Sequence, residues 1–339
     1  MKLNRVADFF LAVCFLVFFA HLWLEKERIN KQSFQQLGAK IDSLEVAVDT
    51  LRQGAYELRR QVEAMNYIDL PEELYFCGQR VPLEKPFVRR KLEDEIFSLT
   101  KFKANRWRVD LYLREAQFYF PYFEEGLAQD SLPLDLKYIA VIESELNNEA
   151  RSPMNAVGIW QLIPGTAVKW ALEVGYYIDD RRDFAESFRG ARAEFKELHQ
   201  RFNDWLMVAA AYNAGKRRLE EAIADNQEQR ERLWQEKQVI LDSTYFDLQL
   251  PAETTEYGPR FLAMKIVMEN YKLYGFRDPP YSPADVEEVT YVVSEKKRIL
   301  EVAADLGMSV PDFRSLNARF VKSEIPPGFY KMRKLKKKQ

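Results

Sequence analysis

The sequence predicts a mainly helical protein made of a membrane anchor, a helical stalk, a large helical domain and a small C-terminal unit. Three observations support this fold class. A long apolar run follows the N-terminus, an unbroken heptad pattern follows that run, and over residues 88–274 apolar residues recur at helical spacing without a convincing alternating strand. With 339 residues, 47% of them hydrophobic and 30% charged, most of the chain should fold, in two or three parts.

The composition argues against several classes of protein. A net charge of −2 argues against nucleic acid as a partner. Cys14 lies within the apolar run and Cys77 stands alone, so neither a disulfide framework nor a metal cluster is expected. With only His21 and His199, a histidine zinc site or a Ser/His triad is implausible. We therefore expect no metal and no cofactor.

Residues 1–25 are predicted to anchor the chain in a membrane. The sequence is apolar over residues 6–24, with two polar interruptions, which is long enough to span a bilayer core. A cleaved signal peptide is the alternative. However, Phe18-Phe19-Ala20 has a bulky residue where a cleavage site needs a small one, so we expect the anchor to be retained.

Residues 26–66 are predicted to form a coiled-coil stalk. From Phe34 to Met65, apolar residues alternate at spacings of three and four without a break. With Phe34 at position a, the a sites include Ile41, Val48 and Val62, and the d sites are Leu37, Leu44, Leu51 and Leu58. β-Branched residues at a with leucine at d favour a parallel two-stranded coil, and hence a parallel homodimer. The alternative is a helix that packs this stripe on its own globular domain.

The heptad pattern breaks after residue 66, where two prolines and a glycine follow. Residues 67–130 are predicted as a helical extension that precedes a larger domain at 131–280. The charged segment 226–247 is interpreted as an extended helix or a flap.

Residues 288–333 are predicted to form a small unit with the order strand, helix, helix, strand. Residues 288–294 suit a strand, Gly307 would close the first helix and Ser309 would cap the second. The tail at 334–339 is strongly basic. A solvated end is the simplest interpretation, and attraction to anionic wall polymers or lipid is the alternative.

One carboxylate of the large domain stands among apolar residues. In the helix predicted over residues 134–146, Leu136 and Ile139 lie seven and four residues before Glu143, and Leu146 lies three after it. These spacings put all four side chains on one face. A carboxyl desolvated in this way tends to stay protonated, which suits a proton donor. The alternative is a surface glutamate at a helix end.

Residues 131–263 resemble the soluble lytic transglycosylase domain of the lysozyme-like superfamily. The family's Glu-Ser motif occurs at 143–144, its Gly-Leu-Trp/Met-Gln motif at 158–161 as Gly-Ile-Trp-Gln, and its Ala-Tyr-Asn-Ala-Gly motif unchanged at 211–215. In the closing segment, Tyr257 stands at the position of the family's active-site tyrosine. Each motif alone is weak, but four in the family's order form a strong resemblance.

The chain departs from the family pattern in three places. Glu145 replaces the glycine that usually follows Glu-Ser, and Asn148 replaces a proline shortly beyond. The segment between Gly215 and Leu250 is also longer than expected. These departures concern the shape of the cleft wall and the length of substrate preferred, and they leave Glu143 untouched.

Glu143 has no suitable carboxylate partner nearby in the sequence. Hydrolysis of a glycoside usually needs two carboxylates that flank the bond. Glu145 is roughly 200° away around a helix, and Asp135 is about 12 Å away along it. A single carboxyl is enough if the nucleophile is a hydroxyl of the substrate itself, since intramolecular attack has a high effective molarity.

The resemblance implies a lysozyme-like catalytic domain at 131–280, and residues 67–130 resemble the helical stretch that precedes it in the membrane-bound subfamily. The implied reaction cleaves the β-1,4 bond between N-acetylmuramic acid and N-acetylglucosamine in peptidoglycan. Glu143 would protonate the leaving oxygen and then accept the proton of the C6 hydroxyl, which closes a 1,6-anhydro ring.

Five further residues receive supporting roles from the resemblance. Ser144 would hydrogen-bond the catalytic carboxyl or the substrate, and Gln161 would offer its amide to the N-acetyl group. Tyr212 and Asn213 would supply stacking and hydrogen bonds in the glycan groove, and Tyr257 would orient Glu143 or the N-acetyl oxygen. The alternatives are a polar residue at a helix end for Ser144 and core packing for Tyr212.

The unit at 288–333 resembles a LysM module, a class that binds glycans containing N-acetylglucosamine. It has the strand, the two helices and the Leu-Asn ending, but Ser-Glu-Lys-Lys at 294–297 replaces the usual Gly-Asp-Thr turn. The fold is therefore expected, and glycan binding by this unit stays open.

Together these features predict a single-pass protein of the inner membrane with its catalytic domain on the periplasmic side, acting on peptidoglycan glycan strands as a lytic transglycosylase. Two alternatives remain open at the level of sequence. One is a true hydrolase of the same fold, like the goose-type lysozymes, and the other is a non-catalytic scaffold that binds the wall.

Overall fold

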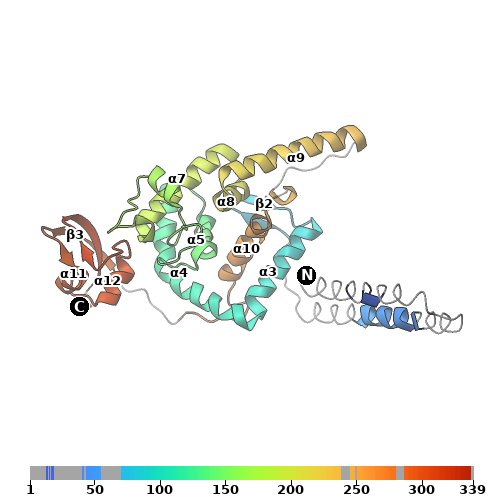
Figure 1. The fold of residues 1–339 in the computed structure, drawn as a ribbon, viewed down its shortest axis with the longest axis horizontal. Helices are drawn as coiled ribbons and strands as arrows, with labels where there is room; N and C mark the ends of the chain where they lie inside the picture. The colour runs from blue at the N-terminus through green and yellow to red at the C-terminus, as the bar shows by residue number, and fades with distance from the viewer. Residues whose placement is uncertain are drawn as a thin grey trace. The chain divides into compact units, whose positions relative to one another are not determined.

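Figure 1 shows the computed structural model of the chain. It describes residues 70–237, 245–248, 250–279 and 286–336, and before them residues 13, 15, 17, 18, 40, 41 and 43–54. The chain divides into two compact units, residues 1–67 and 68–339. The second unit is mainly helical, as predicted, and contains the candidate site.

The described residues of the first unit are helical. Over residues 43–54 the helix agrees with the predicted stalk. Two leucines of the heptad seam, Leu44 and Leu51, have 52% and 73% of their surface exposed. Pairing of two chains along this seam stays a prediction.

The predicted membrane anchor at 1–25 lies outside the described residues, apart from positions 13, 15, 17 and 18. Within the part of the chain that the structure describes, no helix has both the length and the apolar content needed to cross a bilayer.

A two-stranded hairpin opens the second unit, in a stretch predicted to be a helical extension. Strand β1 (Leu74–Phe76) pairs antiparallel with β2 (Gln79–Val81). The two-residue turn between them is Cys77-Gly78, and both residues have positive φ, as a tight hairpin turn requires. Phe76 is fully buried and meets the ring of Phe261 edge to face at 4.4 Å.

Three long helices frame the catalytic region. Helix α3 (Pro86–Lys101) starts at a proline, which suits the first turn because its missing N–H has no helical partner there. Helix α4 (Lys103–Gln129) follows directly, and α10 (Ala252–Glu269) packs on α3 and on the short helix α5 (Lys137–Ser144). Figure 1 shows α10 among these helices.

Helix α8 (Trp205–Ala214) lies in the core. Its residues 205–211 are all buried, as expected for a helix that is apolar on every side. It packs against α7 (Phe184–Phe202), α9 (Lys216–Lys237) and α10. The remaining short elements of this region are η1 (Leu134–Leu136), α6 (Pro164–Lys169), η2 (Asp180–Arg182) and η3 (Tyr245–Asp247).

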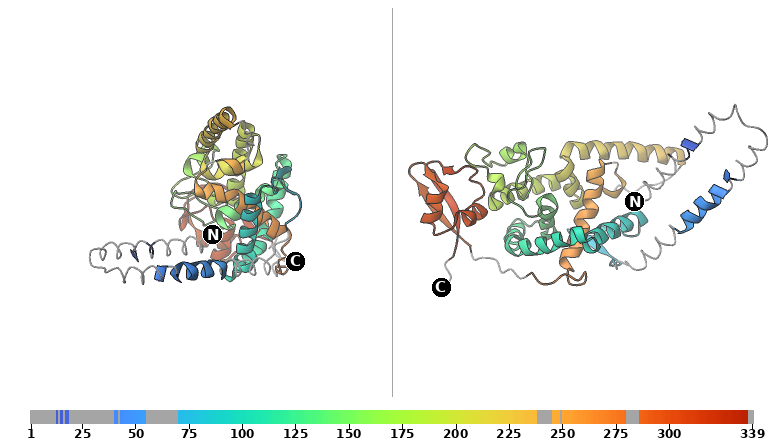
Figure 2. Two further views of the ribbon diagram at one scale, coloured as in Figure 1. Left: turned by 90° about the vertical axis from the view of Figure 1, so that its right-hand side faces the viewer. Right: turned by 60° about the horizontal axis from the view of Figure 1, so that its bottom comes forward.

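The charged segment predicted as an extended helix or flap is a helix as far as residue 237. Helix α9 (Lys216–Lys237) is 22 residues long and strongly polar. Figures 1 and 2 both show it projecting beyond the neighbouring helices. The longer segment between Gly215 and Leu250 is therefore mostly accounted for by this helix.

The C-terminal unit has the predicted order of strand, two helices and strand. Ser309 caps the second helix by accepting the N–H of Asp312, and Gly307 follows the first helix with φ of 69°. The two long strands pair antiparallel, and two short strands form a separate antiparallel pair. The elements are β3 (Val286–Val293), β4 (Lys297–Arg298), α11 (Ile299–Asp305), α12 (Val310–Leu316), β5 (Glu324–Ile325) and β6 (Gly328–Leu335).

This C-terminal unit is bound to the loop that precedes α7. Ile178 of the loop joins the hydrophobic core of the unit and forms a β-bridge with Phe320. Asp180 pairs with Arg319 at 2.5 Å. These contacts join the unit and the helical domain into one compact body.

Candidate active site

Helix α5 ends immediately after Glu143-Ser144. Glu145 and Leu146 both have left-handed backbones, with φ of 59° and 62°. The N–H of Leu146 donates to the carbonyl of Ala140, and that of Glu145 to Val141, which is the hydrogen-bond pattern of a Schellman motif. Two consecutive left-handed residues without glycine are strained, and such strain is often found at functional sites.

The carboxyl of Glu143 is held by Tyr257 of α10. The Tyr257 hydroxyl donates to Oε1 of Glu143 at 2.7 Å. Leu136, Ile139 and Leu146 are all buried, as the spacing predicted, although Leu146 lies just beyond the end of α5 and not on its helical face. Glu143 itself stays partly exposed, which leaves its carboxyl able to reach a ligand.

Burial raises the pKa of Glu143 to about 7 from its ordinary value of 4.5. The hydrogen bond from Tyr257 opposes this rise because it favours the ionised form. The charge of Glu253 adds to the rise by repulsion. A carboxyl with a pKa near neutrality can both give and accept a proton under physiological conditions.

Both tyrosines beside Glu143 stay neutral donors. Burial and the nearby charge of Glu143 raise the pKa of Tyr257 and of Tyr212 well above the ordinary value. Their hydroxyls therefore keep their protons over the whole range in which Glu143 titrates.

The turn at 158–161 ties the site together through its backbone. The carbonyl of Ile159 accepts the hydroxyl of Ser144 at 2.8 Å. The next carbonyl, that of Trp160, accepts the hydroxyl of Tyr212 at 2.6 Å. Gly158 has φ of 82°, and a Cβ there would lie 1.7 Å from the carbonyl oxygen of Arg181, so only glycine fits.

Trp160 belongs to the core. It is fully buried, its ring stacks on Phe188 with centroids 5.3 Å apart, and Phe123 meets it edge to face at 5.0 Å. Its contribution to the site is the backbone carbonyl that holds Tyr212.

Gln161 has a left-handed backbone, with φ of 45°. Its side-chain amide donates to the carbonyls of Gly158 at 2.8 Å and Ala150 at 3.3 Å. Because these bonds use the amide nitrogen, any contact with an N-acetyl group would be made by the amide oxygen accepting its N–H.

Asn213 connects the end of α8 to the start of α10. Its Oδ1 accepts the hydroxyl of Thr254 at 3.0 Å. Thr254 lies in the first turn of α10, three residues before Tyr257. The Ala-Tyr-Asn-Ala-Gly motif thus contacts both the turn at 158–161 and the helix that carries Tyr257.

Glu145 and Asp135, the two carboxylates considered above as partners for Glu143, are bound elsewhere. Glu145 pairs with Arg108 at 3.4 Å. Asp135 pairs with Lys265 at 3.1 Å and accepts the backbone N–H of Cys77. Their structural roles agree with the argument that neither acts with Glu143.

Sequence reasoning missed Glu253 as an electrostatic neighbour of Glu143. Glu253 is exposed in the first turn of α10 and lies four residues before Tyr257, on the same face of that helix. This spacing is the signal that could have identified it. Thr254, whose hydroxyl holds Asn213, was also missed.

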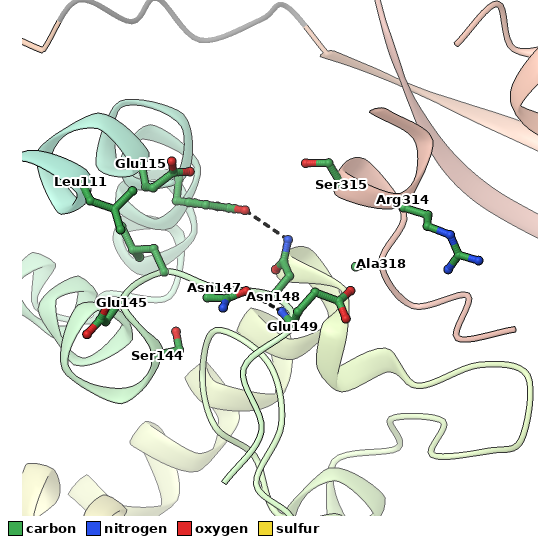
Figure 3. A pocket seen from close by; sticks show the side chains of 12 residues that line it. Leu111, Glu115, Ser144, Glu145, Asn147, Asn148, Glu149, Arg314, Ser315 and Ala318 are labelled. Carbon is green, nitrogen blue, oxygen red and sulfur yellow. Dashed lines mark hydrogen bonds between the residues drawn. The ribbon is translucent and has the colours of Figure 1, made fainter. Parts of the chain in front are cut away.

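A cavity lies beside the end of α5 (Figure 3). Its volume is about 590 Å³, and α12 of the C-terminal unit forms one wall with Arg314 and Ser315. Ser144 and Glu145 line this cavity, whereas Glu143 does not appear among its lining residues. The two residues that follow Glu143 therefore line a cavity that Glu143 itself does not line.

Tyr257→Phe should raise the pKa of Glu143 above 7, because it removes the donor that favours the ionised form. The activity limb that depends on protonated Glu143 should move to higher pH by about one unit. The pH profile of kcat/KM measures this shift. Glu253→Gln removes a repulsive charge and should move the same limb to lower pH, and a common direction for both variants would contradict the assignment.

Comparison with known proteins agrees with the resemblance found in the motifs. Residues 121–235 match the family model for the transglycosylase SLT domain. The match contains Glu143, Gln161 and Tyr212, and it ends before Tyr257.

One curated relative is membrane-bound lytic murein transglycosylase D of Escherichia coli (strain K12), which is 30% identical over 210 residues. The match covers 62% of this chain and 44% of the relative, so the chain spans less than half of that protein. Two solved lytic transglycosylases are also similar. Slt70 from Escherichia coli is 21% identical, covering 55% of this chain and 30% of that chain with a TM-score of 0.40. An inactive variant of Slt from Pseudomonas aeruginosa is 20% identical, covering 45% and 24% with a TM-score of 0.34.

Proposed function

We propose that this chain, which carries a transglycosylase SLT domain, is a peptidoglycan lytic transglycosylase. The observation that carries the proposal is Glu143, a single carboxyl whose pKa burial raises to about 7 and which Tyr257 holds at 2.7 Å. The carboxylates closest to it in the sequence are engaged elsewhere, so the arrangement favours a reaction whose nucleophile comes from the substrate.

The proposed reaction breaks the bond between C1 of N-acetylmuramic acid and the oxygen of the next N-acetylglucosamine. Protonated Glu143 gives its proton to that oxygen, which leaves as a hydroxyl. The resulting carboxylate takes the proton of the C6 hydroxyl on the same muramic acid, and the C6 oxygen bonds to C1. The proton balance closes because Glu143 is protonated again, and no water is consumed.

The surrounding residues support this reaction in different ways. We assign Tyr257 to holding the carboxyl, and Gln161 to accepting the N-acetyl N–H. Tyr212 and Asn213 would line the glycan groove, with Tyr212 fixed by the carbonyl at 160. Ser144, predicted as a contact of the carboxyl or substrate, bonds to the carbonyl of Ile159, which supports a role in building the wall of the site.

Hydrolysis is the second candidate, and one observation favours it. Glu253 is near enough to raise the pKa of Glu143, so a second carboxylate is present at the edge of the site. A hydrolase would use such a group to activate water. The side chain of Glu253 is exposed and does not hold the carboxyl of Glu143. We therefore place hydrolysis second.

The products distinguish the two reactions. Purified full-length protein incubated with peptidoglycan should release muropeptides with 1,6-anhydro ends, lighter by one water than hydrolysis products. Mass spectrometry of the released material measures this difference. Reducing ends in place of anhydro ends would move the assignment to hydrolase, and no release at all would support a wall-binding scaffold.

The location is proposed from the sequence. Residues 1–25 would anchor the chain in the inner membrane by a single span, with the catalytic domain on the periplasmic side where peptidoglycan lies. The printed name of the curated relative describes that protein as membrane-bound, which supports the proposal. The C-terminal unit would be LysM-like in its strand and helix order, and its contacts with the loop before α7 support a structural role first.

The stalk is proposed to pair two chains in parallel. The exposed seam leucines support this, and two chains anchored in one membrane would meet at high effective concentration. Leu44→Glu should abolish pairing because it buries an unpaired charge in the seam, while catalysis survives. Analytical ultracentrifugation of a soluble form covering residues 26–339 measures the effect. A monomeric parent at high micromolar concentration would rule out the dimer.

A further inference from the structure

Near the start of α10, next to Tyr257, a side chain from outside the helix lies between two backbone groups of the helix. The hydroxyl of Tyr245 accepts the N–H of Gly258 at 2.9 Å and donates to the carbonyl of Thr254. In a regular helix, the carbonyl of residue 254 and the N–H of residue 258 are hydrogen-bond partners. A phenol from outside the helix therefore sits between two groups of its ladder, which is one recognised cause of helix distortion.

Pro259 removes a second backbone hydrogen bond next to the one at Thr254 and Gly258. Proline has no N–H, so the carbonyl of Thr255 has no donor four residues further along. That carbonyl lies 3.3 Å from the same Tyr245 hydroxyl. One phenol thus serves two consecutive carbonyls in the turn that carries Tyr257.

Gly258 is the residue that lets Tyr245 come so close. A Cβ at position 258 would lie 2.4 Å from a ring carbon of Tyr245 and 2.9 Å from its hydroxyl. Real Cβ atoms do not approach that closely, so a side chain there would push Tyr245 out. Tyr245 is itself buried, and its ring fills the space that the glycine leaves.

The segment that holds Tyr245 is bound to two other elements through Asp247. Asp247 accepts the ammonium of Lys85, just before α3, at 2.8 and 3.0 Å. Its backbone carbonyl accepts the side-chain amide of Asn226 from α9 at 3.1 Å. The phenol is therefore held in place by α3 and by the projecting helix α9, both remote from Glu143 in sequence.

We propose that Tyr245 is a positioning residue for the reaction proposed above, on which this inference rests. By bridging the first turn of α10, its hydroxyl sets the direction of Tyr257 and so the hydrogen bond to Glu143. The same turn places Thr254, whose hydroxyl holds Asn213. Tyr245 touches neither the carboxyl nor the proposed substrate, and it acts through Tyr257.

The test removes the hydroxyl and keeps the ring. In full-length protein, Tyr245→Phe should lower kcat/KM about tenfold and move its alkaline limb to higher pH, as Tyr257→Phe does. If Tyr245 acts through Tyr257, adding Tyr245→Phe to Tyr257→Phe should cost less than about twofold more. An equal cost in both backgrounds would overturn the proposal.

A second readout does not require catalysis. The difference in unfolding free energy between each protein and its Glu143→Gln counterpart grows with pH until the folded-state pKa of Glu143 is reached. In the parent this growth should stop near pH 7, and in Tyr245→Phe it should stop at higher pH. If the parent released no anhydro products, the proposed function would fail while this measurement still decided the role of Tyr245.

Tyr138→Phe is the matched control. Tyr138 is also buried, and its hydroxyl reaches the far end of α10 through Glu269 at 3.2 Å. It should lower the unfolding free energy by a similar amount and leave the pH limb in place. A shift of the limb in Tyr138→Phe as large as in Tyr245→Phe would show that any loosening of α10 is enough, and would overturn the specific role of Tyr245.

Discussion

Glu143→Gln should abolish the release of anhydro-muropeptides, lowering kcat/KM by at least about a thousandfold. The amide cannot give a proton to the leaving oxygen or accept one from the C6 hydroxyl. Its carbonyl oxygen can still accept the Tyr257 hydroxyl, so the site should keep its shape. Glu145→Gln is the control. Glu145 pairs with Arg108, so this variant should leave most activity intact.

The same substitution should stabilise the protein at alkaline pH. The folded-state pKa of Glu143 is about 7 and the ordinary value is 4.5. The protonated carboxyl therefore contributes stability that is complete below pH 4.5 and is lost as the pH rises through 7. Above that pH, Glu143→Gln should be more stable than the parent by up to about 3 kcal/mol. Denaturant unfolding at pH 5 and pH 8.5 measures the difference, and an equal effect at both pH values would contradict a raised folded-state pKa of Glu143.

Features that depend on local periodicity could be predicted from the sequence. The apolar face around Glu143 follows from spacings of three, four and seven residues, and the structure buries those neighbours. The cap at Ser309 and the turn at Gly307 follow from the conformational preferences of single residues. The hairpin at 74–81 was missed because its strands are only three residues long.

Contacts between distant segments could not be predicted in this way. The hydroxyl of Ser144 can bond to the carbonyl of Ala140 one turn before it, as helix geometry allows. Only the folded chain shows that it also reaches the carbonyl of Ile159. The ring of Tyr245 fits against Gly258 because the glycine has no side chain. Nothing in the sequence around either residue predicts that the two lie together. Motif positions identify the family, whereas these pairings decide what each motif residue touches.

The departure at Glu145 shows how a substitution can keep a backbone shape. The family's glycine suits a left-handed backbone at no steric cost. Glu145 adopts the same region with φ of 59°, and its side chain is held by Arg108 and by a hydrogen bond with Tyr112. These two contacts offset the backbone strain of a non-glycine residue at this position. Glu143 stays in the last turn of α5.

Arg333→Met should destabilise the protein by about 3–5 kcal/mol. Arg333 in β6 pairs with Asp183 at 2.7 Å, and the two side chains are only 10% and 2% exposed. Asp183 also caps α7 by accepting the N–H groups of Ala185 and Glu186. Removing the arginine leaves a buried carboxylate without its charge partner, which costs more than the pair contributes.

Two further variants separate the buried charge from the loss of packing. Lys334→Met removes the neighbouring cation, whose partner Glu287 is 43% exposed, and should cost less than about 1 kcal/mol. Asp183→Asn added to Arg333→Met removes the unpaired charge, and asparagine still caps a helix well, so this double variant should recover much of the loss. Urea unfolding of the full-length chain gives the three values. Arg333 joins the C-terminal unit to the first turn of α7. A cost for Arg333→Met no larger than that for Lys334→Met would contradict a stabilising role for this buried charge pair.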